Sequence, residues 1–142
     1  MNDPQRLAEQ VVAGMLAKDE FTRWLGIEVV EIAPAWCVCR MTVRPEMVNG
    51  FGVAHGGIVF SLADSAFAFA CNTQGKITMS IENGITYPAA VQVGDVLTAV
   101  AVEETASRRL GYFRVVVSNH QSETVGLFHG TAYRTSQEHP LP

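Results

Sequence analysis

One carboxylate interrupts the most apolar stretch of this 142-residue chain. Asp64 lies within residues 57–70, where most other side chains are apolar. An ionised carboxylate in such surroundings is costly unless another group compensates it. A structural carboxylate at a helix edge and a catalytic base both fit such a residue, and the residues that precede it favour the catalytic interpretation.

The residues before this stretch could hold a developing negative charge. His55, Gly56 and Gly57 stand where a helix would begin, and the free N–H groups at a helix start can bind an oxyanion. Glycine also lets a substrate approach the backbone closely. Asn49, in the same loop, could orient a carbonyl or a water with its amide. Taken singly, each of these residues is also compatible with an ordinary turn.

The spacing of these groups predicts a dimer. Gly56 and Asp64 are separated by about 12 Å in a helix, at about 1.5 Å per residue. A reacting carbonyl needs its base and its oxyanion donor at about 3 Å each, so one copy of the helix cannot supply both. Two antiparallel copies across a two-fold axis would bring Asp64 of one chain to Gly56 of the other.

Hydrophobic periodicity predicts the elements that position these residues. A helix is expected over residues 4–19, with Asp3 as its cap and Pro4 in its first turn. A loop over 44–55 leads into a second helix over 57–71, which Gly75 stops and which should be buried all round because apolar residues lie on nearly every side. Alternating stretches predict strands at 27–32, 36–43, 78–87, 96–104, 110–119 and 124–135.

This order of elements predicts an α+β fold in one domain, residues 1–142. Hairpin-length connections between the last four strands imply an antiparallel sheet, which must curl around the long apolar helix to cover it. Hydrophobic residues make up 48% of the chain and charged residues 17%. Such an apolar composition suggests that another copy of the chain covers part of the surface.

Composition also disfavours several classes of partner. The net charge of −4, with ten Lys and Arg in total, argues against a nucleic-acid binder. A polar N-terminus and the lack of a long uncharged apolar run argue against a signal sequence or a membrane span. Cys37, Cys39 and Cys71 have no metal-ligand spacing; we expect no metal, reduced thiols and a cytoplasmic protein.

The loop and the second helix together resemble a known family. The run from Asn49 to Gly57, followed by Leu62-Ala63-Asp64, is similar to the signature of hotdog-fold thioesterases, in particular the phenylacetate-degradation (PaaI-type) subfamily. Residues 80–90, 94–95 and 107–113 also match, so the resemblance covers about residues 26–134. It implies the hotdog fold, hydrolysis of acyl-CoA without a cofactor, and homodimers, often paired into tetramers, with coenzyme A at subunit interfaces.

The resemblance also implies roles for individual residues. The Gly56 N–H would polarise the thioester carbonyl, and Asp64 would act as general base or as nucleophile. Asn49 would help to orient the carboxylate, water or thioester, and His55 would lie beside the thioester. In some relatives the strand serine matched here by Ser80 is near the partner's carboxylate. The residues assigned to substrate binding are Gly57, Ser80, Asn83, Arg108 and Arg109.

Two arginines and the similarity to the subfamily bear on the identity of the substrate. Arg108 and Arg109 could hold the phosphates of coenzyme A, although a solvated turn explains them equally well. The acyl group is expected to be aryl or of short to medium length, and similarity to the subfamily suggests (hydroxy)phenylacetyl-CoA. The alternatives are a hotdog hydratase or dehydratase and a non-catalytic acyl-CoA-binding protein.

Overall fold

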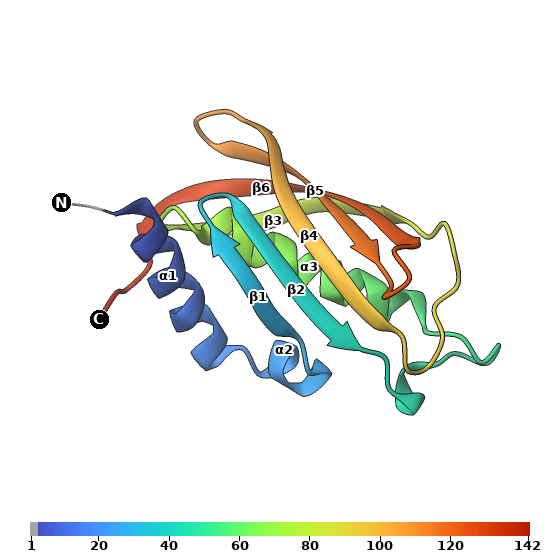
Figure 1. Cartoon of the computed structure of the whole chain (residues 1–142). Helices are drawn as coiled ribbons and strands as arrows, with labels where there is room; N and C mark the ends of the chain where they lie inside the picture. Colours follow the sequence, from blue (N-terminus) through green and yellow to red (C-terminus); the bar gives the residue numbers. More distant parts are fainter. Residues whose placement is uncertain (1–2) are drawn as a thin grey trace.

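The computed structural model describes residues 3–142, so Met1 and Asn2 of the predicted domain lie outside the described residues. Figure 1 shows one long helix lying against a curved sheet of long strands. In chain order the elements are α1 (Pro4–Lys18), α2 (Glu20–Leu25), β1 (Glu28–Ala33), β2 (Trp36–Thr42), the 3-10 helix η1 (Pro45–Met47), α3 (Gly56–Asn72), β3 (Lys76–Thr86), β4 (Val96–Ala106), β5 (Leu110–Ser118) and β6 (Thr124–Glu138).

The six strands form one antiparallel sheet in the order β1-β2-β4-β5-β6-β3. The sheet curves around α3, which lies along its inner face and contacts every strand (Figure 1). The predicted α+β architecture, a long central helix wrapped by a curved antiparallel sheet, is therefore confirmed.

Alternation along the strands builds the core beneath α3. In β4 the side chains of Leu97, Ala99 and Ala101 are fully buried, because every second residue of a strand points to the same face. Cys37 and Cys39 of β2 obey the same rule: both are buried free thiols, with their sulfur atoms 3.8 Å apart. The two cysteines therefore lie on the same, inner face of the sheet.

Local signals define where the helices begin and end. The Asp3 carboxylate accepts a hydrogen bond of 3.0 Å from the Gln5 N–H, as the predicted cap of α1. Helix α3 ends at Asn72, and Gly75 then turns the chain into β3 with a φ of +100°, a conformation that favours glycine. No helix within residues 3–142 combines the length and hydropathy needed to cross a membrane.

One helix was missed, and one expectation about a helix was wrong. Helix α2 was not predicted, because six residues are too few to show a period; Asp19 caps its start, and Gly26, with a φ of +76°, ends it. Helix α3 is not buried all round, because the sheet covers only one side of it. The remaining side is an open stripe of partly exposed residues at helical spacing: Ile58, Ser61, Asp64, Ser65 and Ala68.

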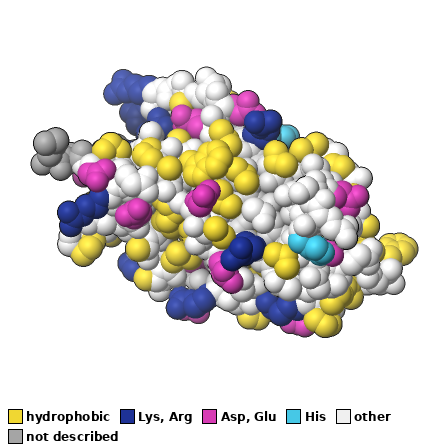
Figure 2. All heavy atoms as spheres, in the orientation of Figure 1, with side chains coloured by type: hydrophobic (Ala, Val, Ile, Leu, Met, Phe, Trp, Pro, Cys, Tyr) yellow, Lys and Arg dark blue, Asp and Glu magenta, His cyan; other side chains and the backbone are white. Residues whose placement is uncertain are grey.

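The outer face of the sheet is also partly apolar. Strand register places Val38, Val100, Val116 and Leu127 side by side across β2, β4, β5 and β6. Figure 2 shows hydrophobic side chains gathered on this face, with charged residues around them. The molecule therefore has two incompletely covered apolar surfaces, the open stripe of α3 and the outer row of the sheet.

Candidate active site

Asp64 is the only acidic residue of α3, and it lies in the middle of the open stripe. Its side chain is half-buried, because the sheet covers the other side of the helix. Burial raises the pKa of the Asp64 carboxyl above its ordinary value, and a hydrogen bond from Asn83 acts in the opposite direction. A carboxylate with a raised pKa on an accessible helix face is well suited to accept a proton.

A short chain of hydrogen bonds leads from β3 to this carboxylate. The Ser80 hydroxyl donates to the Asn83 Oδ1 at 2.9 Å, and the Asn83 Nδ2 donates to the Asp64 Oδ1 at 3.2 Å. Both strand residues were predicted to bind substrate, and Ser80 was expected near the partner's carboxylate. Within one chain, Asn83 instead contacts Asp64 directly, and Ser80 is connected to Asp64 through it.

The start of α3 offers one free backbone donor. His55 caps the helix with its Nδ1, which accepts the Gly57 N–H at 2.9 Å. Within residues 3–142 the Gly56 N–H has no acceptor, whereas the next two N–H groups of the helix both bond to His55. Of the two predicted glycines, Gly56 can therefore donate to an external oxygen, while the Gly57 N–H is already used.

Tyr87 is a part of this site that the sequence did not reveal. Its hydroxyl donates to the Gly56 carbonyl oxygen at 2.8 Å, and its ring occupies the space that a side chain at position 56 would need, 3.0 Å from an added Cβ. Tyr87 also lines a cavity of about 340 Å³ beside Gly56, together with residues 88–91. An aromatic residue just after a strand carries no sequence signal for this contact.

Asn49 forms no hydrogen bond with Asp64 within residues 3–142. It belongs to the loop between η1 and α3, which projects from the body of the molecule in Figure 1. The Asn49 Oδ1 accepts the Phe51 N–H at 2.9 Å and so stabilises the tip of the loop, where the Phe51 side chain is 92% exposed.

Arg108 and Arg109 occupy the tight turn between β4 and β5. The backbone of this turn is fixed by Arg134, whose guanidinium donates to the carbonyl oxygens of Ser107 and Arg108, each at 3.1 Å. Across residues 3–142, neither Arg108 nor Arg109 forms an ion pair. In Figure 1 this turn projects at the end of the molecule where α3 terminates.

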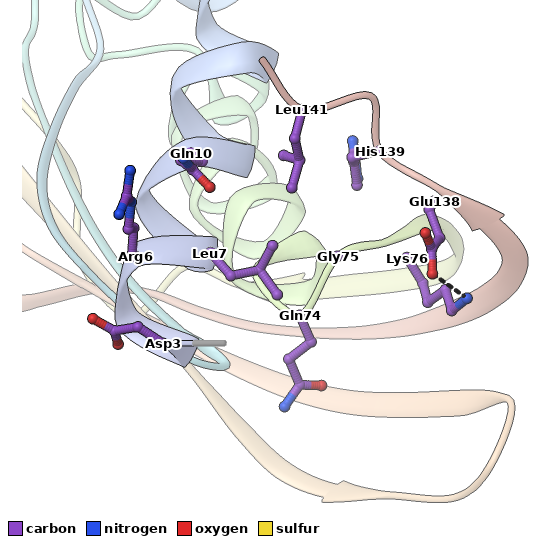
Figure 3. A pocket seen from close by; sticks show the side chains of 10 residues that line it. All are labelled: Asp3, Arg6, Leu7, Gln10, Gln74, Gly75, Lys76, Glu138, His139 and Leu141. Atoms are coloured by element: carbon purple, nitrogen blue, oxygen red, sulfur yellow. Dashed lines mark hydrogen bonds and ion pairs between the residues drawn. The ribbon is translucent and has the colours of Figure 1, made fainter. Parts of the chain in front are cut away.

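A second cavity lies beside α1. It has a volume of about 400 Å³ between α1, the start of β3 and the C-terminal segment, and Figure 3 shows its lining. Charges of both signs face it, with the Lys76 ammonium 3.1 Å from the Glu138 carboxylate. None of the predicted site residues lines this cavity. In the part of the chain that the structure describes, no three His, Cys, Asp or Glu residues gather as a metal site would need.

Comparison with known proteins places the chain in a family. A model described as the thioesterase superfamily matches residues 51–125. The chain is 36% identical over 127 residues to acyl-coenzyme A thioesterase PaaI of Escherichia coli K12, covering 89% of this chain and 91% of that protein. It is 30% identical over 113 residues to human acyl-coenzyme A thioesterase 13, covering 78% of this chain and 81% of the human protein.

A solved structure agrees with these sequence matches. The PaaI protein of the E. coli phenylacetic acid degradation operon aligns with a TM-score of 0.93 and 34% identity, over 96% of this chain and 99% of that one. The chain therefore belongs to the thioesterase superfamily, with the hotdog fold and the thioester hydrolase class that its sequence predicted.

Proposed function

We propose that this protein hydrolyses the thioester bond of an acyl-CoA. The observation that carries the proposal is the pair formed by a half-buried carboxylate, Asp64, and an unpaired backbone donor, the Gly56 N–H, on one helix. The relatives named above are acyl-coenzyme A thioesterases, which supports coenzyme A as the leaving group.

These two groups are sufficient for the chemistry. The Gly56 N–H donates to the thioester oxygen and stabilises the negative charge that develops there. The Asp64 carboxylate takes a proton from water while the water oxygen bonds to the carbonyl carbon. The C–S bond then breaks, and the carboxylic acid and the thiol of coenzyme A are released. In the alternative route Asp64 attacks the carbonyl carbon itself, and water hydrolyses the resulting anhydride.

The proposed site needs two chains. Gly56 and Asp64 are about 12 Å apart along one α3 helix. Strand β3 ends the sheet, so one edge of its 11 residues is open for pairing with a second copy. Pairing of two β3 edges across a two-fold axis would make the two α3 helices antiparallel and bring their open stripes together. We propose this homodimer, and a dimer of dimers that buries the outer apolar row of the sheet.

Arg108 and Arg109 fit the phosphates of coenzyme A in this arrangement. Their turn lies at the end of α3, which is where an antiparallel partner helix would begin (Figure 1). Exposed guanidinium groups without ion pairs are well suited to phosphate oxygens. We further propose an aryl or short- to medium-chain acyl group, such as (hydroxy)phenylacetyl, and, because the three thiols are free, a cytoplasmic enzyme.

The test is release of thiol from a panel of aryl, short-chain and medium-chain acyl-CoAs. The background from the enzyme is low, since its three cysteines are all buried. We expect turnover of at least one acyl class, and a loss of about 100-fold or more in kcat for Asp64→Ala, as for a lost base or nucleophile. Asp3→Ala, which removes a carboxylate far from the site, is the control.

Three results would contradict the proposal. No thiol release from any acyl-CoA despite tight binding would identify a binding protein. Addition of water to an enoyl-CoA without thiol release would identify a hydratase. Near-normal turnover by Asp64→Ala would show that another residue activates the water.

A further inference from the structure

We propose that Asn83 is a positioning residue that fixes the Asp64 carboxylate for attack, with Ser80 acting through it. This inference rests on the proposed function and gives Asn83 a role different from substrate binding. The contact that supports it is the 3.2 Å hydrogen bond from the Asn83 Nδ2 to the Asp64 Oδ1. Within residues 3–142 the other oxygen, Oδ2, accepts no hydrogen bond, so one oxygen is held while the other can react.

The direction of the hydrogen bonds follows from the chemistry of the three side chains. An ionised carboxylate can only accept, so the amide must turn its NH₂ group toward Asp64. The amide oxygen then faces Ser80, whose hydroxyl must donate. Both hydrogen bonds form in only one orientation of the amide, and flipping the amide would break both.

A β-bulge makes this arrangement possible. Ser80 and Asn83 are three residues apart, which would place them on opposite faces of a regular strand. The pairing of β3 with β6 shifts between Ser80 and Glu82, leaving Ile81 as an extra residue. After the shift both residues face inward, toward α3, since Ser80 pairs with Ala132 and Asn83 pairs with Gly130.

Gly130 provides the space for the amide. A Cβ at position 130 would lie 3.0 Å from the Asn83 Oδ1 and 2.9 Å from the Phe67 ring. The Asn83 side chain therefore lies over the backbone of β6, between the strand and the helix. This packing limits the positions that the amide can adopt, as a positioning role requires.

The hydrogen bond from Asn83 favours the ionised form of Asp64, which is the form that the reaction needs. Burial raises the pKa of Asp64 and favours its protonated form, while the bond from Asn83 stabilises the ionised form. Burial, and to a lesser extent the negative charge of Asp64, raise the pKa of Cys71 in the same helix to about 12. The Cys71 thiol therefore stays neutral. Asn83 thus helps to keep the carboxylate both oriented and ionised.

The first experiment compares kcat with KM. We expect Asn83→Ala to lower kcat about 10- to 100-fold, as when a partner that orients a reacting group is lost, with KM changed less than about twofold. The control is Asn119→Ala, which removes an asparagine that bonds within a surface turn. A raised KM with unchanged kcat would overturn the proposal in favour of substrate binding.

The second experiment tests the order of the hydrogen-bond chain. If Ser80 acts through Asn83, Ser80→Ala lowers kcat in the wild-type background, by less than Asn83→Ala does, and has no further effect once Asn83 is alanine. Equal losses from Ser80→Ala in both backgrounds would show that the two residues act independently, and the proposed chain would be wrong.

The third experiment does not depend on activity. The carboxyl group of Asp64, labelled with ¹³C, is titrated by NMR in the wild type, Asn83→Ala and Asn119→Ala. The pKa of Asp64 should rise only in Asn83→Ala. The acid limb of the plot of kcat against pH should shift to higher pH in the same variant. An unchanged pKa overturns the inference about Asn83, whereas absence of turnover by the wild type overturns only the proposed function.

Discussion

The two ends of helix α3 are built in opposite ways. At its end, the buried Asn72 uses its whole side chain: Nδ2 donates to the carbonyl oxygens of Ala68 and Thr78, and Oδ1 accepts from the Thr78 N–H. His139 from the C-terminal segment adds a bond of 2.7 Å to the same Oδ1. Because the Thr78 N–H already donates to this oxygen, the His139 ring donates through Nε2. Both polar atoms of the Asn72 side chain are therefore paired.

At its start, α3 leaves the Gly56 N–H without an acceptor in the described chain. The residue is a glycine, the preceding loop is exposed, and Tyr87 fixes the adjacent carbonyl. Leaving this donor without a protein acceptor costs little free energy while water can reach it from the cavity, and the donor can then bind a substrate oxygen.

The difference separates stability from function along one helix. Paired buried groups hold the end of α3 to the sheet and the C-terminal segment, and their loss should affect the free energy of unfolding. The start of α3 leaves the Gly56 N–H free to bind substrate, so changes at this residue should affect turnover. Variants at the two ends should therefore have opposite profiles of stability and activity.

Among variants at the two ends of α3, the largest effect is expected from Gly56→Ala. The added Cβ would lie 3.0 Å from the Tyr87 ring, so either the ring or the backbone of position 56 must move. Displacement of an oxyanion donor by a fraction of an ångström should lower kcat about 100-fold, with the free energy of unfolding changed by less than about 1 kcal/mol. Steady-state kinetics and urea unfolding measure the two quantities.

The control for this variant is Gly14→Ala in α1, where the new methyl group meets no atom within 4 Å. It should leave kcat unchanged, since it lies far from the site, and should stabilise the helix slightly. Normal turnover by Gly56→Ala would remove this residue from the mechanism.

At the other end of the helix, Asn72→Ala should reverse this profile. The substitution leaves the buried N–H and C=O groups of Thr78 without partners, which should lower the free energy of unfolding by about 2 kcal/mol. At a temperature where the variant is folded, kcat should stay within about twofold of wild type. Gln74→Ala, on the exposed turn that follows, is the control. A large loss of kcat in folded Asn72→Ala would contradict the division between the two ends.

The sequence predicted those features that depend on period and length. Alternation over residues 96–104 and 110–119 identified β4 and β5 to within two residues, because one face of each strand is buried. The apolar run after His55 was too long for a strand, which identified α3. The polar interruption of this run by Asp64 indicated the site, since such a residue needs a reason to be there.

The features that were missed depend on contacts between distant segments. The bulge at Ile81 places Ser80 and Asn83 on the same face, where regular alternation would place them on opposite faces, and no residue type in β3 signals it. Tyr87 reaches Gly56 from 31 residues away, and His139 reaches Asn72 from 67 residues away. Only the folded chain brings these pairs together, so the positioning of the site could not be derived from local patterns.

A smaller effect on turnover is expected from Tyr87→Phe. The ring stays in place over Gly56, but the hydroxyl no longer donates to the Gly56 carbonyl oxygen, a bond worth about 1 kcal/mol. Since burial raises the pKa of Tyr87, the hydroxyl remains a donor throughout the neutral range. We expect kcat to fall about fivefold. Tyr112→Phe on the outer face of the sheet is the control, and equal kcat values for both variants would exclude this contact from the site.

The smallest effect is expected at the C-terminal end of α3, from protonation of His139. Burial lowers the pKa of this imidazole in the folded protein, so the unfolded chain binds the proton more tightly. The stabilisation is complete above the unfolded pKa of about 6.5 and is lost as the pH falls through the lower folded value.

The variant His139→Gln tests this pH dependence, because glutamine keeps a donor for Asn72 but cannot titrate. Between pH 7.5 and pH 5, the wild type should therefore lose slightly more thermal stability than the variant, while all other titrating groups are shared. An equal loss in both proteins would mean that the imidazole titrates alike in the folded and unfolded chains, and that the C-terminal segment does not couple the end of α3 to pH.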